Sequence, residues 1–211
     1  MKPFTVLDAK AAPLMQQNVN TDIIIPIHRR RDVAQADLGP YAFEPWRYLP
    51  DGSENPEFFL NKPAYRGAEI VVADNNFACG SSREGAVWAM AGMGVRCVIA
   101  PSFGPIFFNN CFQNGVLPIQ LPRAEVLAIA GELEAATRPG ANSEPRLTVD
   151  LQDRTVTTPS GRKISFHVDA IRRDALLKGL NEVALTLTRE AEITAHQAKA
   201  RARTPWLYPA G

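Results

Sequence analysis

The stretch that decides the fold is IVVADNNFACGSSREGAVWAMAGMGVRCVIA, residues 70–100. Its first four residues are apolar without alternation, which predicts a strand buried on both faces. Residues 82–93 have helical composition and end at Gly94, a residue type that favours the end of a helix. A second strand is expected at 95–100. A strand, a helix and a strand of these lengths form a parallel βαβ unit.

The segments that follow extend this unit. A helix is expected at 105–113 and is ended by Asn114-Gly115. Residues 116–121 are expected to form a further strand. Pro118 places this strand at an edge or a bulge, because proline cannot donate to a ladder of hydrogen bonds. The predicted parallel core therefore covers about residues 70–121.

The C-terminal third is expected to add a small α/β unit to this core. Residues 147–151 and 164–168 alternate between apolar and polar, with a turn at 159–161 between them, which predicts antiparallel strands. Helices are expected at 123–137, 171–178 and 188–203. The predicted fold class is thus α/β, with one domain over residues 1–211 that ends in a helix and tail at 188–211.

The first third shows little helical periodicity. Ile23-Ile24-Ile25 is a short apolar run closed by Pro26, which predicts a strand end or a turn. Prolines and glycines interrupt residues 39–63 every few positions, so this segment is expected to be an irregular loop. An irregular stretch of this length in a compact domain usually serves a function or lies on a partner.

Composition disfavours several classes of protein. The 211 residues carry 23 Lys+Arg against 22 Asp+Glu, a net charge of +1, which disfavours nucleic-acid or membrane-surface binding by bulk charge. No apolar run approaches the roughly 18 residues of a membrane span. The N-terminus has no apolar core of signal-peptide length. We therefore expect a cytoplasmic protein that binds neither nucleic acid nor membrane.

The three cysteines, Cys79, Cys97 and Cys111, are widely spaced and form no C-x-x-C pair. This spacing disfavours a zinc ribbon, a redox dithiol and an iron–sulfur cluster held by this chain alone. We expect Cys97 and Cys111 to be small buried side chains. Cys79 lies in a turn rich in glycine and serine, so it is the cysteine expected to lie closest to a reactive site. No metal site is predicted.

The segment Gly80-Ser81-Ser82-Arg83-Glu84 is the candidate for chemistry. Ser81 and Glu84 have the spacing of a capping box, and a helix N-terminus suits an anion. The turn follows the carboxyl end of a parallel strand, where open α/β sheets place ligands. Arg83 is unfavourable in a first helical turn, which indicates a carboxylate partner. A serine in this field could act as a base or nucleophile. The alternative is a capping box alone, with Arg83 as a solvated surface charge.

Residues 76–86, NFACGSSREGA, resemble the signature of the mobile domain of the aconitase superfamily. They are most similar to the small subunits of 3-isopropylmalate dehydratase. Residues 18–26, NVNTDIIIP, are similar to an early segment of that family. Further similar blocks follow in the same order over nearly the whole chain, at 100–103, 106–107, 109–111, 114–118, 147–151 and 176–180.

The resemblance implies a single swivelling β/β/α domain and a separate large subunit that carries a [4Fe–4S] cluster on its own cysteines. It implies a reversible dehydration and rehydration of a hydroxy di- or tricarboxylate. In that reaction the cluster is a Lewis acid on the hydroxyl, and a base removes the proton beside a carboxylate. By this resemblance Ser81 is the base, while Ser82 and Arg83 bind the substrate. Three supporting residues are implied: Thr21, Asp22 and Gly80. Apart from the resemblance, the Thr21-Asp22 pair could equally be a turn or a cap.

Some positions depart from the family's usual residues: Asn20 replaces an aspartate, Ala78 a glycine and Gly85 a histidine. The sharper departure is Arg29-Arg30-Arg31, where the family usually has an aromatic-leucine pair that suits an isopropyl group. Arg30 and Arg31 are therefore candidate ligands of a substrate carboxylate, through charge-assisted hydrogen bonds. The alternatives are a shifted loop with solvated arginines and an ion-pair patch between subunits.

Three functions are consistent with these features. The first is the small subunit of a hydro-lyase that isomerises 2- and 3-isopropylmalate in leucine biosynthesis. The second is the same chemistry on a homocitrate-like or methylmalate-like acid. The third is a stand-alone binding module in which residues 28–31 contact a partner such as RNA. The near-neutral charge and the intact Ser81-Ser82-Arg83 favour the first two.

Overall fold

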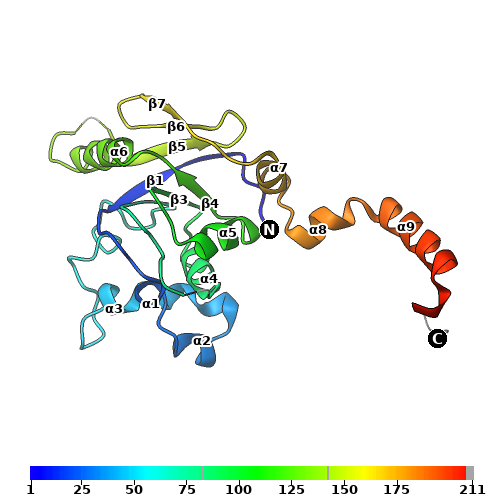
Figure 1. The fold of residues 1–211 in the computed structure, drawn as a ribbon. Coiled ribbons are helices and arrows are strands. Elements are labelled where there is room, and N and C mark those ends of the chain that lie inside the picture. Colours follow the sequence, from blue (N-terminus) through cyan, green and yellow to red (C-terminus); the bar gives the residue numbers. More distant parts are fainter. Residues whose placement is uncertain (82, 142, 208–211) are drawn as a thin grey trace.

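One mixed sheet organises the protein in a computed structural model that describes residues 1–81, 83–141 and 143–207 (Figure 1). Its seven strands have the order β4-β3-β2-β1-β5-β6-β7. The strands are β1 (Val6–Leu14), β2 (Ile70–Ala73), β3 (Cys97–Ala100), β4 (Leu117–Gln120), β5 (Arg146–Asp150), β6 (Thr155–Thr157) and β7 (Lys163–Ser165). The α-helices are α1 (Thr21–Ile24), α2 (Arg29–Asp32), α3 (Glu44–Arg47), α4 (Gly85–Gly92), α5 (Pro105–Gln113), α6 (Arg123–Ala135), α7 (Ala170–Lys178), α8 (Glu182–Leu187) and α9 (Glu190–Arg203).

The predicted parallel core is confirmed. β2 pairs in parallel with β3, and β3 with β4, while α4 and α5 form the connections between them. α5 has the predicted bounds, and β4 with Pro118 lies at the edge of the sheet. β3 begins at Cys97, two residues later than predicted, because the N–H of Val95 still bonds to the carbonyl of Met90 at the end of α4, at 2.9 Å.

β1 lies in the middle of the sheet and is not among the strands expected from the sequence. Its second half, residues 11–14, pairs in parallel with β2. Its first half, residues 6–10, pairs in antiparallel fashion with β5. One strand therefore joins the parallel half of the sheet to the antiparallel half.

The C-terminal addition is antiparallel, as predicted, but it has an extra strand. β5 pairs with β6, and β6 with β7. The turn at 159–161 therefore connects β6 to β7 instead of connecting the two strands expected on either side of it. β7 ends at Ser165, so residues 166–168 continue outside the sheet.

Two hydrophobic cores cover the two faces of the sheet, which accounts for the strands without alternation. In β2, Val71 and Ala73 face one core, whereas Ile70 and Val72 face the other. The first core contains the buried side chains of α4, and the second contains those of α6. Burial on both faces is the usual environment of parallel strands.

The prediction of a strand end or a turn at residues 23–25 is wrong. Residues 21–24 form the short helix α1, and Asn20 caps it by accepting the N–H of Ile23 at 2.9 Å. A side-chain oxygen at this position satisfies an N–H group that would otherwise have no partner in the first turn. The local cap therefore overrides the strand preference of the isoleucines.

Residues 39–63 are largely irregular, as expected, yet they belong to the core of this chain. The rings of Phe43, Phe58 and Phe59 pack together, with centroid distances of 5.6, 5.9 and 4.7 Å. Gly39 touches the backbone of α4, where an added Cβ atom would lie 2.4 Å from the carbonyl oxygen of Gly92. This close approach requires a residue without a side chain.

The last two helices form an arm that extends away from the body of the protein (Figure 1). α7 ends at Gly179, whose φ of 69° is the left-handed conformation expected of a glycine at a helix end. α8 was not predicted, and no residue of α8 or α9 is buried. Among the described residues, no helix combines the length and the apolar character needed to cross a membrane.

Asp74, directly after β2, is a buried carboxylate that forms an ion pair with the partly exposed Arg123. Its side chain is 4% exposed and accepts hydrogen bonds from Nε and Nη2 of Arg123 at 2.9 and 2.8 Å. The hydrogen bond from Arg123 holds the pKa of Asp74 below its usual value, although burial acts in the opposite direction. The pair fixes the start of α6 against the end of β2.

We expect Asp74→Asn to lower the free energy of unfolding at pH 7 by about 1–3 kcal/mol, because charged hydrogen bonds to a buried group are weakened. The lowered pKa means that the carboxylate's stabilisation is complete above the unfolded value of about 3.9. It is lost as the pH falls through the folded value. Urea unfolding of both proteins should therefore show a difference at pH 7 that shrinks below about pH 4.

Asp8→Asn is the matched control for this prediction. Asp8 pairs with Arg146 on the surface and is 59% exposed, so its replacement should change stability much less. Equal losses in the two variants, or a loss in Asp74→Asn that is the same at pH 7 and pH 3, would contradict the role given to the buried Asp74 carboxylate.

Candidate functional site

The predicted site lies where β1 and β2 end at the same edge of the sheet. Asn20, after β1, and Cys79, after β2, form a parallel bridge, and the N–H of Thr21 bonds to the carbonyl of Cys79 at 2.9 Å. Gly80 follows with a φ of 104°, a conformation that side chains rarely adopt. The bridge thereby places Ser81 beside Thr21, although 60 residues separate them in the sequence.

The Ser81 hydroxyl is surrounded by hydrogen-bonding groups. Its Oγ lies 2.7 Å from Oγ1 of Thr21, and it accepts from Nε of Arg83 at 2.8 Å and from the Arg83 backbone N–H at 3.4 Å. The Ser81 N–H donates to Thr21 Oγ1 at 3.2 Å, and Thr21 is only 2% exposed. A fixed cation and fixed dipoles aimed at one oxygen favour negative charge on it.

Arg83 has a carboxylate partner within this chain. Its Nη2 donates to Oδ1 of Asp22 in an ion pair whose side chains are 22% and 58% exposed. The alternative of Arg83 as a free surface charge is therefore wrong. Thr21 and Asp22 also do more than cap a turn, because both contact the site while Asn20 caps α1.

The predicted capping box of Ser81 and Glu84 is wrong. α4 begins at Gly85, three residues later than expected, and its N-cap, Glu84, makes no side-chain capping bond. Instead Glu84 accepts a hydrogen bond of 2.6 Å from the amide of Asn114, at the end of α5. Ser81 therefore precedes the helix, and its hydroxyl is free of the helix backbone and committed to Thr21 and Arg83.

The loop before Ser81 is held in place by the loop after β3. Phe77 receives a backbone hydrogen bond from Gly104 at 2.8 Å, and a Cβ atom on Gly104 would lie 2.4 Å from the carbonyl oxygen of Ala78. Asn76 and Ala78 have φ values of 58° and 56° in the left-handed region. Ala78, in place of the family's usual glycine, is therefore strained.

The structure separates the three consecutive arginines. Arg29 donates to both carboxylate oxygens of Glu44, at 2.8 and 2.5 Å, and this hydrogen bonding holds the pKa of Glu44 below its usual value. Arg30 lies against Gly85 at the start of α4. Arg31 is exposed. Arg29 is thus occupied within the chain, whereas Arg30 lies close to the loop of Ser81.

The cysteines do not fit the iron–sulfur cluster that the resemblance implies. Cys97 and Cys111 lie fully buried in the two different cores, and burial raises the pKa of both thiols. Cluster ligation requires thiolates. Within the ranges that the structure describes, no three His, Cys, Asp or Glu side chains form a group able to hold a metal.

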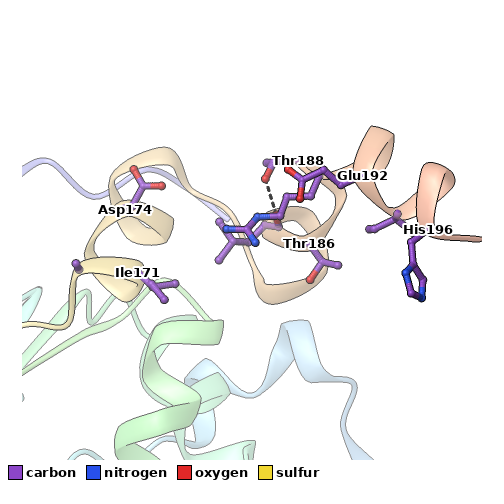
Figure 2. A pocket seen from close by; sticks show the side chains of 10 residues that line it. Ile171, Asp174, Thr186, Thr188, Glu192 and His196 are labelled. Carbon is purple, nitrogen blue, oxygen red and sulfur yellow. Dashed lines mark hydrogen bonds between the residues drawn. The ribbon is translucent and has the colours of Figure 1, made fainter.

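A cavity of about 740 Å³ lies between α7 and the C-terminal arm, and not at the predicted site (Figure 2). Ile171 and Asp174 of α7 line one side of it, and Glu192 and His196 of α9 line the other. Of the predicted site residues that the structure describes, none lines this cavity. The geometry around Ser81 therefore stands apart from it, at the edge of the sheet.

Ser82 lies outside the described residues, so its role stays a prediction. Sequence reasoning did not find Asn114 as the partner of Glu84 or Glu44 as the partner of Arg29. Gly85 stands out in the sequence only as a departure from the family's histidine. The sequence signal that could have pointed to Gly85 is a residue without a side chain directly after the serine motif. The structure places this residue against Arg30.

Family models match three parts of the chain. One described as the aconitase C-terminal domain matches residues 1–124. One described as LeuD_N matches residues 135–170. One described as the C-terminal domain of the 3-isopropylmalate dehydratase small subunit matches residues 182–210.

Individual proteins agree with these models. The 3-isopropylmalate dehydratase small subunits of Paramagnetospirillum magneticum and Dinoroseobacter shibae are 50% and 48% identical over 207 residues, 98% of this chain and 100% of each relative. The crystal structure of a 3-isopropylmalate dehydratase from Methanocaldococcus jannaschii matches with a TM-score of 0.63 over 90% of this chain and 99% of that chain. At 23% identity, that match shows the fold. The chain therefore belongs to the family of 3-isopropylmalate dehydratase small subunits.

Proposed function

We propose that this chain, with a large subunit, interconverts 2-isopropylmalate and 3-isopropylmalate in leucine biosynthesis by removing and re-adding water. The observation that carries the proposal is the environment of Ser81, whose Oγ is contacted by the Thr21 hydroxyl and the Arg83 guanidinium. The names of its relatives support the choice of substrate. The chain alone is an incomplete enzyme in this proposal.

Ser81 acts as the catalytic base. Its alkoxide takes the proton from the substrate carbon beside a carboxylate, and the hydroxyl of the neighbouring carbon leaves. The proton and the hydroxide make up the water that is lost. Addition of water in the opposite sense gives the isomer. Arg83 Nε and the Thr21 hydroxyl stabilise the alkoxide without rearrangement, because they already contact the oxygen.

The [4Fe–4S] cluster belongs to the large subunit in this proposal and would supply a Lewis acid for the leaving hydroxyl. Asp22 keeps the Arg83 guanidinium in place beside Ser81. Gly80 allows the chain to turn between the Cys79 bridge and Ser81. This chain's part is thus to hold the base and to bind the acid groups of the substrate.

The substrate carries two carboxylates, and the site offers cations for them. Ser82 and Arg83 bind one carboxylate in this proposal, and Arg30 and Arg31 bind the other. A second candidate substrate follows if Arg30 instead faces the branch of the substrate: an acid of the homocitrate type, whose branch carries a carboxylate. A guanidinium gains charge-assisted hydrogen bonds from such a branch and nothing from an isopropyl group.

Turnover by this chain, co-purified anaerobically with the large subunit encoded in the same genome, tests the function. The panel contains 3-isopropylmalate, a homocitrate-type acid and methyl-substituted malates. We expect the highest kcat/KM for 3-isopropylmalate and no turnover by this chain alone. Preference for a carboxylate-branched acid would establish the second candidate. Inactivity of the complex on every acid would refute both.

Ser81→Ala should lower kcat of the complex by about 10²- to 10⁴-fold, the usual contribution of a general base, with KM changed only a few-fold. Steady-state kinetics with 3-isopropylmalate measure this effect. Ser165→Ala, an exposed serine in β7, is the matched control and should leave kcat unchanged. A Ser81→Ala enzyme with more than a tenth of normal kcat would remove Ser81 from the role of base.

Thr21→Val should lower kcat about 10-fold or more, because it removes the hydroxyl that supports Ser81 and leaves the Ser81 N–H without its acceptor. The rise of kcat with pH should also move to higher pH, since the alkoxide forms less readily. Thr21→Ser keeps the hydroxyl and should restore both kcat and the pH profile. An unshifted profile in Thr21→Val would mean that Thr21 contributes to packing alone.

A further inference from the structure

The aliphatic part of Arg30 lies directly on the α carbon of Gly85. A Cβ atom added to Gly85 would be 2.6 Å from Cδ, 2.9 Å from Nε and 3.2 Å from Cγ of Arg30. Gly85 begins α4 and is absent from the glycines with positive φ, so its backbone does not require glycine. Glycine is unfavourable in a helix compared with alanine. The remaining reason for a glycine here is the space that it leaves for Arg30.

Arg30 differs from Arg29 and Arg31 in the environment of its guanidinium. Arg29 is paired with Glu44, and Arg31 is exposed to solvent. The Nε of Arg30 is buried, and it has no hydrogen-bond partner among the residues that the structure describes. The Arg30 guanidinium lies 5.8 Å from the ring centroid of Trp88, a contact that does not satisfy its N–H groups. A buried charged donor without an acceptor is costly. The Nε is covered by this chain, but Arg30 as a whole is only partly buried, so a carboxylate from outside the chain would reach the guanidinium through its terminal Nη groups.

We propose that Gly85 is a positioning residue that holds Arg30 beside the Ser81 loop, where Arg30 binds a carboxylate supplied from outside this chain. Gly85 follows Glu84, so the bare α carbon lies at the junction between the loop and α4. A larger residue at position 85 expels the arginine. Gly85 and Arg30 then form one functional unit, which links two of the departures from the family's usual sequence.

The carboxylate can come from the substrate or from the large subunit, and the first source rests on the proposed function. Both sources use the same chemistry, a guanidinium that donates to a carboxylate. They differ in what is lost with Arg30. A substrate carboxylate makes Arg30 a determinant of KM, whereas a carboxylate of the large subunit makes it a determinant of the affinity between the subunits.

The experiment compares Arg30→Ala, Gly85→Ala and the double variant in the reconstituted complex, by KM, kcat and the dissociation constant of the subunits. Each single variant should raise either KM or the subunit dissociation constant about 10-fold, with kcat within about 3-fold of normal. The double variant should be no worse than Arg30→Ala, because Gly85 acts only through Arg30. Gly131→Ala and Arg138→Ala are the controls: a Cβ on Gly131 in α6 meets nothing within 4 Å, and Arg138 is exposed.

A second measurement follows Arg30 itself in the ¹⁵N-labelled full chain without substrate. The Nε–H resonance of Arg30 is assigned by its absence from Arg30→Ala. Because this nitrogen is buried beside Gly85, its hydrogen exchange should accelerate at least 10-fold in Gly85→Ala and remain unchanged in Gly131→Ala. Unchanged exchange in Gly85→Ala would overturn the positioning role.

The outcomes distinguish the two sources of the carboxylate, and they distinguish a failure of this inference from a failure of the proposed function. A rise in KM at constant subunit affinity assigns the carboxylate to the substrate, and the reverse assigns it to the large subunit. An Arg30→Ala complex with both constants unchanged overturns the proposal, as do single-variant losses that multiply in the double variant. If the wild-type complex turns over no acid, the proposed function fails. In that case unchanged subunit affinity in Arg30→Ala overturns this inference as well.

Discussion

The parallel pairing of β1 with β2 is the constraint on which the site depends. Parallel neighbours end at the same edge of a sheet, so the segments that follow them meet there. The residues after β1 deliver Thr21 and Asp22, and those after β2 deliver Ser81 and Arg83. Because β1 also pairs with β5, the same strand ties this edge to the C-terminal half of the chain.

Two Arg–Asp pairs at this edge have different environments and therefore different consequences. The pair of Asp74 and Arg123 contains an almost fully buried carboxylate, so it fixes α6 to the sheet. In the pair of Arg83 and Asp22, the carboxylate is more than half exposed, so water and ligands compete for it. A guanidinium held in this way stays in position beside Ser81 and remains accessible to an anion. The pair of Asp74 and Arg123 therefore supports the site from the interior, whereas the pair of Arg83 and Asp22 presents charge at the surface of the site.

The elements that sequence reasoning found are those with a local signal. The apolar residues 70–73 and the helix 105–113 between Gly104 and Asn114 are recognisable from their own residues. β1 contains Asp8, Lys10 and Pro13, which obscure its strand pattern, and only its neighbours in the sheet stabilise it. Likewise, the motif identified Ser81, but its contact with Thr21 depends on strand order, which no short window of sequence contains.

The placement of the thiols gives this protein a set of internal chemical reporters. Cys79 is partly exposed in the site loop, while Cys97 and Cys111 are buried. An alkylating reagent reaches the first thiol in the native fold or after a small local opening. It reaches the other two only when a core opens. Mass spectrometry of one labelling time course therefore resolves the breathing of the loop beside Ser81 from the unfolding of the whole domain, with no engineered probe.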